Sequence, residues 1–268
     1  MTVFMLIYFA GIASCGVQGA KKGNYQSGRE LTIAFSAVLA SFGGGLIRDV
    51  GVLHVYPVVL TPECRPDIAV AVIAAFMYLC AHKNSVTRNA IEWFSAVTDS
   101  SGLGTFIAIG VDKAVDMGAA PVSVFLSGVS TSLGGGILSS VFCGASLLQS
   151  LTVSAPYRII TVGGVFLYSN WIEAGTERVT AQYAIVGYTT VTTLACNPMV
   201  TQAVSKRLAF VIENKLVSDV MMSPYKTYAL YRPYEKIIGY LHDTYKFIYN
   251  VFMVSPKKTI LYHCIRQM

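Results

Sequence analysis

Two identical glycine triplets inside uncharged hydrophobic stretches restrict this chain more than any other feature of its sequence. The triplets are 91 residues apart, and further identical pairs recur at the same offset without a gap. A chain that is this apolar and repeats itself in this way is predicted to be a membrane protein built from two related halves. The triplets are Gly43, Gly44 and Gly45, and Gly134, Gly135 and Gly136. The other matched pairs are Gly11 with Gly102, Gly19 with Gly110, Lys22 with Lys113, and Ser41 with Ser132.

The composition excludes an ordinary soluble domain. Of the 268 residues, 54% are hydrophobic and 13% are charged, with a mean hydropathy of +0.55, whereas soluble domains carry about 25% charged residues. The net charge is +6, and the basic excess lies in residues 201–268, because residues 1–200 hold ten basic and ten acidic side chains. The six cysteines form no CxxC pair and suggest neither a zinc site nor a disulfide framework.

Hydropathy predicts seven membrane-spanning helices and an all-α polytopic fold. A helix needs about 20 apolar residues to cross the hydrocarbon. The third run holds only 14 uncharged residues, and Lys83 at its end can snorkel to the interface. The fifth run is long enough for one helix plus a re-entrant or loop segment. The seven runs are residues 1–20, 31–47, 68–81, 93–111, 117–157, 158–172 and 179–200.

Seven spans place the two termini on opposite sides of the membrane. Basic residues concentrate on the side of the C-terminal tail, so the positive-inside rule predicts an outer N-terminus and a cytoplasmic C-terminus. The repeat contains three spans, and an odd number inverts the second copy relative to the first. We therefore expect repeat one in residues 1–90, repeat two in 91–178, a seventh helix in 179–200 and a tail in 201–268. Inverted repeats create a site or pathway near the bilayer midplane.

Each glycine triplet predicts a soft point in its helix. A glycine inside a helix costs roughly 0.5–1 kcal/mol relative to alanine, so three in a row favour a break or kink, here in the second and fifth helices. A break in hydrocarbon requires protein or water to meet the freed backbone groups, which implies a wet cavity. The alternative is that the glycines only let two helices pack closely.

Polar residues near the triplets are the candidate lining of an ion pathway. Arg48 and Asp49 follow the first triplet, while Ser139 and Ser140 stand at the matching positions of the second. Adjacent residues do not share a helix face, so one charge can face a pore while the other pairs elsewhere, or both can anchor the helix at the interface. The remaining candidates are Asp99, expected near the start of the fourth span, and Thr131 and Ser132, whose hydroxyls can meet the carbonyls of a broken turn or a cation.

These residues resemble those of the trimeric intracellular cation channel family, which includes bacterial members described as glycine transporters. The likeness covers about residues 4–200 and rests on both triplets with their following residues. It implies a homotrimer of seven-helix subunits, each with its own pore for monovalent cations such as K⁺ and Na⁺. The family's second triplet is commonly followed by Arg-Asp, where this chain has Ser139-Ser140. The resemblance also rests on the segments 19–23, 99–104 and 115–118.

The basic tail lies outside the resemblance. Its apolar residues recur at helical spacing, and it contains half of the 16 tyrosines together with ten basic side chains. This mixture fits a surface-lying amphipathic segment attracted to anionic lipid, and it equally fits a small cytoplasmic helical extension. The basic residues expected at a lipid surface include Lys206, Arg207 and Lys215.

The sequence favours a monovalent cation channel of a bacterial inner membrane, with Arg48 and Asp49 at the outer mouth of a pore lined by the two kinked helices. The alternatives are a carrier of a small amino acid such as glycine, and a structural membrane subunit whose glycines only pack. No HExxH, GxSxG or Walker motif is present, and the four histidines are scattered. We therefore expect no enzymatic activity, no cofactor or metal, and no nucleic-acid partner.

Overall fold

A computed structural model describes residues 2–24, 30–81, 85–152 and 155–197, and in these ranges the regular structure is entirely helical. The described helices belong to one compact unit, Met1–Asn197. The predicted tail, including Lys206, Arg207 and Lys215, lies outside the described residues.

Long helices occupy the positions that hydropathy predicted. The fifth uncharged run contains one long helix, α5, followed by the short helix α6, which agrees with the expectation of a helix plus a second segment. Between α2 and α3 the chain forms three short helices. The α-helices are α1 (Val3–Asn24), α2 (Glu30–Leu46), α3 (Arg65–Ala81), α4 (Ser85–Asp116), α5 (Pro121–Phe142), α6 (Leu147–Thr152), α7 (Ala155–Glu173) and α8 (Arg178–Cys196). The short connecting helices are η1 (Ile47–Val52), η2 (Val58–Leu60) and η3 (Pro62–Cys64).

Within the described residues, five helical segments are long and apolar enough to span a membrane. They correspond to α1, α2 with η1, α3 with η3, α4 and α5. Large apolar side chains remain exposed along them, for example Phe35, Ile73 and Phe94. An apolar surface of this extent requires a non-aqueous surrounding, so the chain is an integral membrane protein.

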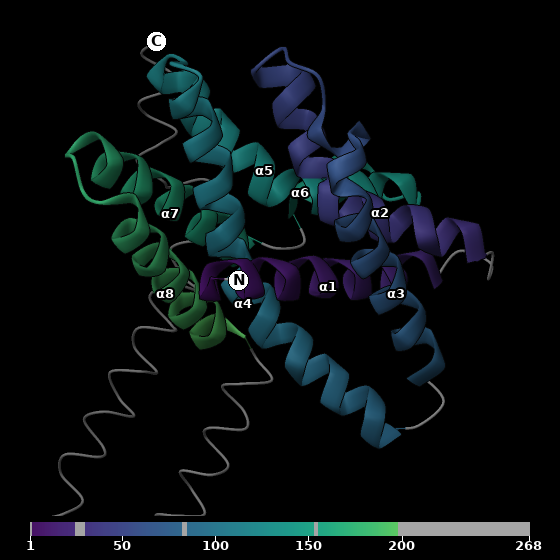
Figure 1. Cartoon of the computed structure of the whole chain (residues 1–268). Helices are drawn as coiled ribbons and strands as arrows, with labels where there is room; N and C mark the ends of the chain where they lie inside the picture. The colour runs from purple at the N-terminus through teal and green to yellow at the C-terminus, as the bar shows by residue number, and fades with distance from the viewer. Residues whose placement is uncertain (1, 25–29, 82–84, 153–154, 198–268) are drawn as a thin grey trace, which may run out of the picture. The chain divides into compact units, whose positions relative to one another are not determined.

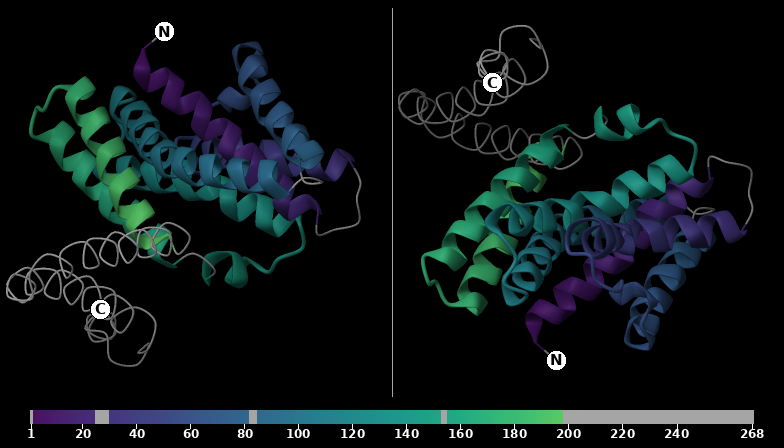
Figure 2. Two further views of the ribbon diagram at one scale, coloured as in Figure 1. Left: turned by 90° about the horizontal axis from the view of Figure 1, so that it is seen from below. Right: turned by 90° about the horizontal axis from the view of Figure 1, so that it is seen from above.

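Helices α1 and α4 form the centre of the unit (Figure 1). Helix α1 packs against α2, α3 and α4, whereas α4 packs against α1, α5, α7 and α8. In every view α7 and α8 lie on one side of this pair and α2 and α3 on the other (Figures 1 and 2). Where α1 and α4 cross, an added Cβ on Gly11 would lie 2.8 Å from the Cα of Gly102. The two backbones approach this closely because neither position carries a side chain.

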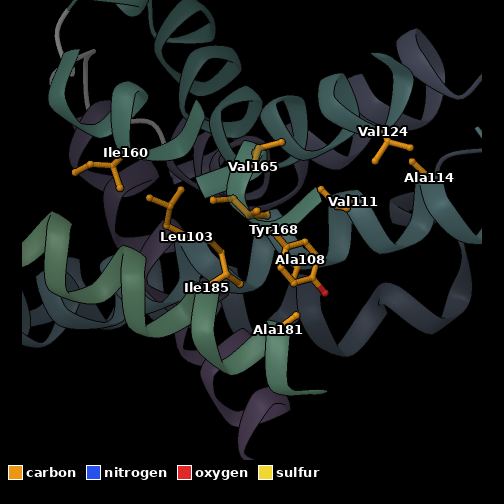
Figure 3. Close-up of a cluster of buried hydrophobic side chains, with 11 residues drawn as sticks. Leu103, Ala108, Val111, Ala114, Val124, Ile160, Val165, Tyr168, Ala181 and Ile185 are labelled. Carbon is orange, nitrogen blue, oxygen red and sulfur yellow. The ribbon is translucent and has the colours of Figure 1, made fainter. Parts of the chain in front are cut away.

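The main hydrophobic core fills the space between α4, α5, α7 and α8 (Figure 3). Its members Ile107, Val165 and Ile185 are fully buried. Tyr168 is also fully buried, and its hydroxyl donates to the carboxylate of Asp112 at 3.0 Å. This bond satisfies the one polar atom that the aromatic ring carries into the core.

Several close contacts recur when both partners are shifted by 91 residues. Gly44 meets the carbonyl oxygen of Thr131, and Gly135 meets that of Ala40. In the same way, Gly19 packs against the Ser36 carbonyl, and Gly110 packs against the Ser127 carbonyl. Each contact between a glycine and a carbonyl thus has a counterpart between the equivalent positions of the other half of the chain.

The helix breaks expected at the triplets do not occur. Both triplets lie inside continuous helical stretches, α2 and α5. The first stretch becomes irregular only after Leu46, where η1 is a short π-helix. There the Leu53 N–H donates to the Arg48 carbonyl at 2.9 Å. Tight packing against a second helix stabilises the triplets in the helical state and offsets their low intrinsic propensity.

Candidate functional site

The glycine triplets form the crossing point of α2 and α5. A Cβ on Gly44 would collide with the carbonyl oxygen of Thr131, and a Cβ on Gly135 would collide with that of Ala40. A Cβ on Gly134 would lie 2.8 Å from the Cα of Gly44. Close helix packing, which the sequence left as an alternative, therefore explains the middle glycine of each triplet.

The last glycine of each triplet has a different surrounding. A Cβ on Gly136 would meet nothing within 4 Å, and a Cβ on Gly45 would meet only the Arg48 guanidinium at 3.8 Å. Gly136 lies on the wall of a cavity of about 540 Å³. The triplet of α5 thus contacts α2 on one face and borders open space on another.

Polar and charged side chains from five long helices, α1, α2, α4, α5 and α7, line this cavity. Lys22 comes from α1, Asp99 from α4, Thr131 and Ser132 from α5, and Arg158 from α7. The other lining residues are Cys15, Gln18, Ala40, Ser41, Phe106, Leu133, Gly136, Ile137, Ser140, Ala145, Gln149, Ser150 and Tyr157. A cavity of this size with a few convergent polar groups is typical of a small-molecule or ion site.

Only some of the predicted pathway residues line this cavity. Four of them line the cavity: Asp99, Thr131, Ser132 and Gly136. The others do not belong to its wall. This second set comprises Gly43, Gly44, Gly45, Arg48, Asp49, Gly134, Gly135 and Ser139.

Asp49 is the centre of a buried group of charges that does not line the cavity. Its Oδ1 accepts from Arg48 Nε at 2.7 Å and from Lys113 Nζ at 2.8 Å, while its Oδ2 accepts from the Val58 N–H at 3.0 Å. The guanidinium of Arg48 also lies 3.4 Å from the Thr131 hydroxyl. We call Arg48, Asp49 and Lys113 the charge cluster.

Burial makes this arrangement costly unless every charge is paired. Asp49 is 1% exposed and Arg48 is 5% exposed. An isolated buried ion costs several kcal/mol, and here two cations and a backbone N–H offset that cost for one carboxylate. Although adjacent residues do not share a helix face, the long arginine side chain folds back onto the neighbouring carboxylate.

Lys22 occupies the position in the first half that Lys113 occupies in the second. Its Nζ donates to the Gly136 carbonyl and to the Ser139 hydroxyl, both at 2.9 Å. Each lysine therefore reaches the segment that follows the triplet of the other half. The offset of 91 residues pairs these two lysines in the sequence, but neither was predicted to line the pathway. Their shared distance from the triplets was the available signal.

Two further sequence interpretations are corrected by the structure. Asp99 does not lie near a helix start, because α4 already begins at Ser85 and the carboxylate lies well inside the helix. The hydroxyls of Thr131 and Ser132 do not meet a broken turn; they donate to the carbonyls of Ser127 and Gly128, one turn earlier in α5, at 2.6 Å each. Such back-bonding satisfies a hydroxyl inside an apolar helix.

The sequence resembles a known family over more than half of its length. Residues 5–83 and 96–171 match the family described as Glycine transporter. The UPF0126 inner membrane protein YadS of Escherichia coli strain K12 is 34% identical over 104 residues, which are 39% of this chain and 48% of that protein. A UPF0126 membrane protein of Vibrio cholerae is 28% identical over 131 residues, 48% of this chain and 52% of that protein. The chain thus matches about half the length of these relatives.

Solved structures share the fold over a larger part of the chain. One of them concerns the structural basis for conductance through TRIC cation channels. Its TM-score is 0.64 at 20% identity, and the match covers 72% of this chain and 92% of that chain. Another, the TRIC trimeric intracellular cation channel orthologue from Rhodobacter sphaeroides, has a TM-score of 0.58 at 25% identity and covers 73% and 97%.

Proposed function

The chain belongs to the glycine transporter family, and from this premise we propose that it conducts monovalent cations, such as K⁺ and Na⁺, across a bacterial inner membrane. The resemblance to trimeric intracellular cation channels predicted from the sequence agrees with the family match and with the similar solved structures. The inner-membrane location follows the name of the E. coli relative. We infer a transport role without enzymatic activity.

The proposed architecture is the one expected from the sequence. Seven spans would form two inverted repeats of three helices, residues 1–90 and 91–178, with α8 as the seventh. Support comes from the reciprocal contacts, such as Gly44 at Thr131 and Gly135 at Ala40. The proposed orientation keeps the N-terminus outside and the C-terminus in the cytoplasm, and the proposed assembly is a homotrimer.

The proposed ion pathway runs beside the crossing of α2 and α5. The single observation that carries it is the cavity of about 540 Å³ that borders Gly136 and is lined in part by polar and charged side chains. The charge cluster would form the outer end of the pathway, where Lys113 and Arg48 neutralise Asp49. We further propose that α2 and α5 bend at their triplets and that this motion widens the route.

Filling the cavity tests this assignment. A Gly136→Leu side chain would enter the cavity without meeting a neighbour at its Cβ, so the helix crossing should persist. Gly187→Leu is the matched control, because Gly187 is also an exposed helical glycine with nothing within 4 Å of an added Cβ, and it does not line the cavity.

The measurement is the single-channel current of the purified full chain in a planar bilayer with KCl. We expect unitary steps for the unaltered chain and for Gly187→Leu, and at least about a tenfold loss of current for Gly136→Leu, which corresponds to about 1.4 kcal/mol in the barrier. Full current through Gly136→Leu would refute the cavity as the ion route. An absence of current from the unaltered chain would refute the channel itself.

A carrier of a small amino acid such as glycine is the second candidate function. The family description and the presence of both a carboxylate and cations on the cavity wall favour it. Saturable uptake of labelled glycine into proteoliposomes, without unitary currents, would support the carrier over the channel.

A further inference from the structure

The cavity lies at positions of the second half whose counterparts in the first half are in contact. In the first half, the Asp49 carboxylate accepts from the Val58 N–H at 3.0 Å. The positions 91 residues later, Ser140 and Gln149, both border the cavity. There the Gln149 N–H donates to the hydroxyl of Ser146, three residues earlier in the chain, at 3.1 Å. The segment that closes on Asp49 in the first half is thus bonded elsewhere in the second.

A contact between helices shows the same difference. The Tyr8 hydroxyl donates to the Asp67 carboxylate at 3.0 Å and joins α1 to α3. The equivalent positions 91 residues later are Asp99 of α4 and Arg158 of α7, and both line the cavity. None of the ion pairs among the described residues joins these two side chains. The first half is therefore closed at this position, whereas the second half is open.

The side chains of the open pair are suited to a direct contact. Each pair combines a short carboxylate with a long side chain, and the halves differ only in which helix supplies which. Tyr8 is the long partner in the first half and Arg158 in the second, so the two pairs span similar distances. A guanidinium can donate two parallel N–H bonds to a carboxylate, and such a charged pair is stronger than a neutral hydrogen bond.

The guanidinium of Arg158 also lacks a complete set of partners. Its Nε is buried and has no hydrogen-bond partner among the described residues. A buried charged group is costly unless it is paired. A conformation in which Arg158 reaches the Asp99 carboxylate would satisfy both groups.

Helix packing indicates that the arginine side chain, and not its helix, makes this movement. In the first half, a Cβ on Gly16 would collide with the Ala71 carbonyl oxygen, so α1 and α3 touch through their backbones. The position equivalent to Gly16 is Ile107, which is fully buried in the main core. A Cβ on Gly164 of α7 would lie 3.0 Å from Ile107 Cδ1. The isoleucine side chain thus keeps the α7 backbone away from α4, and only the long Arg158 side chain can cross the remaining space.

We propose that Arg158 is a latch that closes this cavity by pairing with Asp99, as Tyr8 and Asp67 close the equivalent place in the other half. In the closed state the guanidinium spans the space between α7 and α4. In the open state, which this structure shows, it lies on the cavity wall and the carboxylate is available to a cation. The role of the latch in ion passage rests on the proposed function, whereas the closure of the cavity does not.

The reactivity of Cys15 tests the latch, because Cys15 lines the cavity. The purified full chain in lipid nanodiscs is treated with N-ethylmaleimide, a neutral reagent, and mass spectrometry follows the modification of each cysteine. Cys196 is exposed and does not line the cavity, so its rate calibrates the reagent. We expect Cys15 to react at least about fivefold faster in Arg158→Gln and in Asp99→Asn than in the unaltered chain, because neither variant can populate the closed state.

The two variants also exclude a direct electrostatic effect on the thiol. They change the charge of the cavity in opposite directions, so such an effect would move the two rates oppositely, whereas loss of the latch raises both. Exchanging the two residues in the double variant Asp99→Arg/Arg158→Asp should restore the slow rate. Arg178→Gln is the matched control, because Arg178 pairs with the exposed Asp116, does not line the cavity and should leave the rate unchanged. Arg158→Met replaces the glutamine variant if that one does not fold.

The inference is overturned if Cys15 reacts at the unaltered rate in either single variant, or if the two rates change in opposite directions. The potassium current of the same variants is measured separately in planar bilayers. Faster Cys15 modification in a chain that passes no current would contradict only the channel, and current with unchanged Cys15 reactivity would contradict only the latch.

Discussion

Lys22 and Lys113 occupy matched positions in the two halves of the chain but have different partners. Lys113 contacts the Asp49 carboxylate, which is buried and also holds Arg48. Lys22 contacts a backbone carbonyl and a hydroxyl, and its side chain borders a cavity. The difference arises because Asp49 of the first half corresponds to Ser140 of the second. In one region the lysine is part of a buried ion pair, whereas in the other it borders open space.

The largest effect is expected when the charge cluster loses its only carboxylate. Asp49→Asn leaves Arg48 and Lys113 without their counter-ion, so the free energy of unfolding should fall by about 3–5 kcal/mol. Thermal unfolding in detergent measures the loss.

Asp116→Asn is the control for that substitution. It removes a carboxylate that also pairs with arginine, Arg178, but the two side chains are 57% and 45% exposed. An exposed pair contributes about 0–1 kcal/mol. Equal losses from Asp49→Asn and Asp116→Asn would contradict a special role for the buried cluster.

The next effect concerns the helix crossing between the two regions. Gly135→Ala places a Cβ against the Ala40 carbonyl oxygen, and backbone cannot yield as a side chain does. We expect about 1–3 kcal/mol of destabilisation from overpacking. Gly136→Ala, one residue later, meets no neighbour and should be neutral or stabilise by about 0.5–1 kcal/mol. Melting temperatures of the two variants test the order; a reversed order would show that the crossing is not tightly packed.

The last comparison is between the two lysines themselves. Lys113→Met removes a charged hydrogen bond to a buried carboxylate, at a cost of about 1.5–3 kcal/mol. Lys22→Met removes a cation that has no contacting counter-ion among the described residues. The desolvation cost that it relieves offsets its lost hydrogen bonds, and we expect a change within about 1 kcal/mol. Parallel thermal unfolding of both variants sharpens the comparison, and equal destabilisation would argue against it.

The helices were predictable because hydropathy and charge report directly on them. The run 31–47 became α2 almost residue for residue. The run 93–111 is shorter than α4, which begins at Ser85 and ends at Asp116. Charged residues such as Arg88 and Asp112 are compatible with a helix although they end an apolar run, so hydropathy cannot mark the true helix end. Asp99 was placed near a helix start for this reason.

The site was only partly predictable. Asp99, Thr131, Ser132 and Gly136 were assigned to a pathway and do line the cavity. Arg48 and Asp49 were recognised as unusual, but their mutual ion pair and its link to Lys113 depend on a contact over 64 residues of chain. Local periodicity carries no information about such a contact.

The amino-acid sequence alone determined that this chain is apolar and helical, that its halves repeat at an offset of 91 residues, and that it resembles a channel family. These properties depend on the composition and on the order of residues along the chain, and both are read directly from the sequence. Only the tertiary structure decided that the middle glycines pack, that Gly136 borders a cavity, and that Lys22 and Asp99 both line it. Those outcomes depend on which helix faces meet, because close packing and burial are properties of pairs of distant segments.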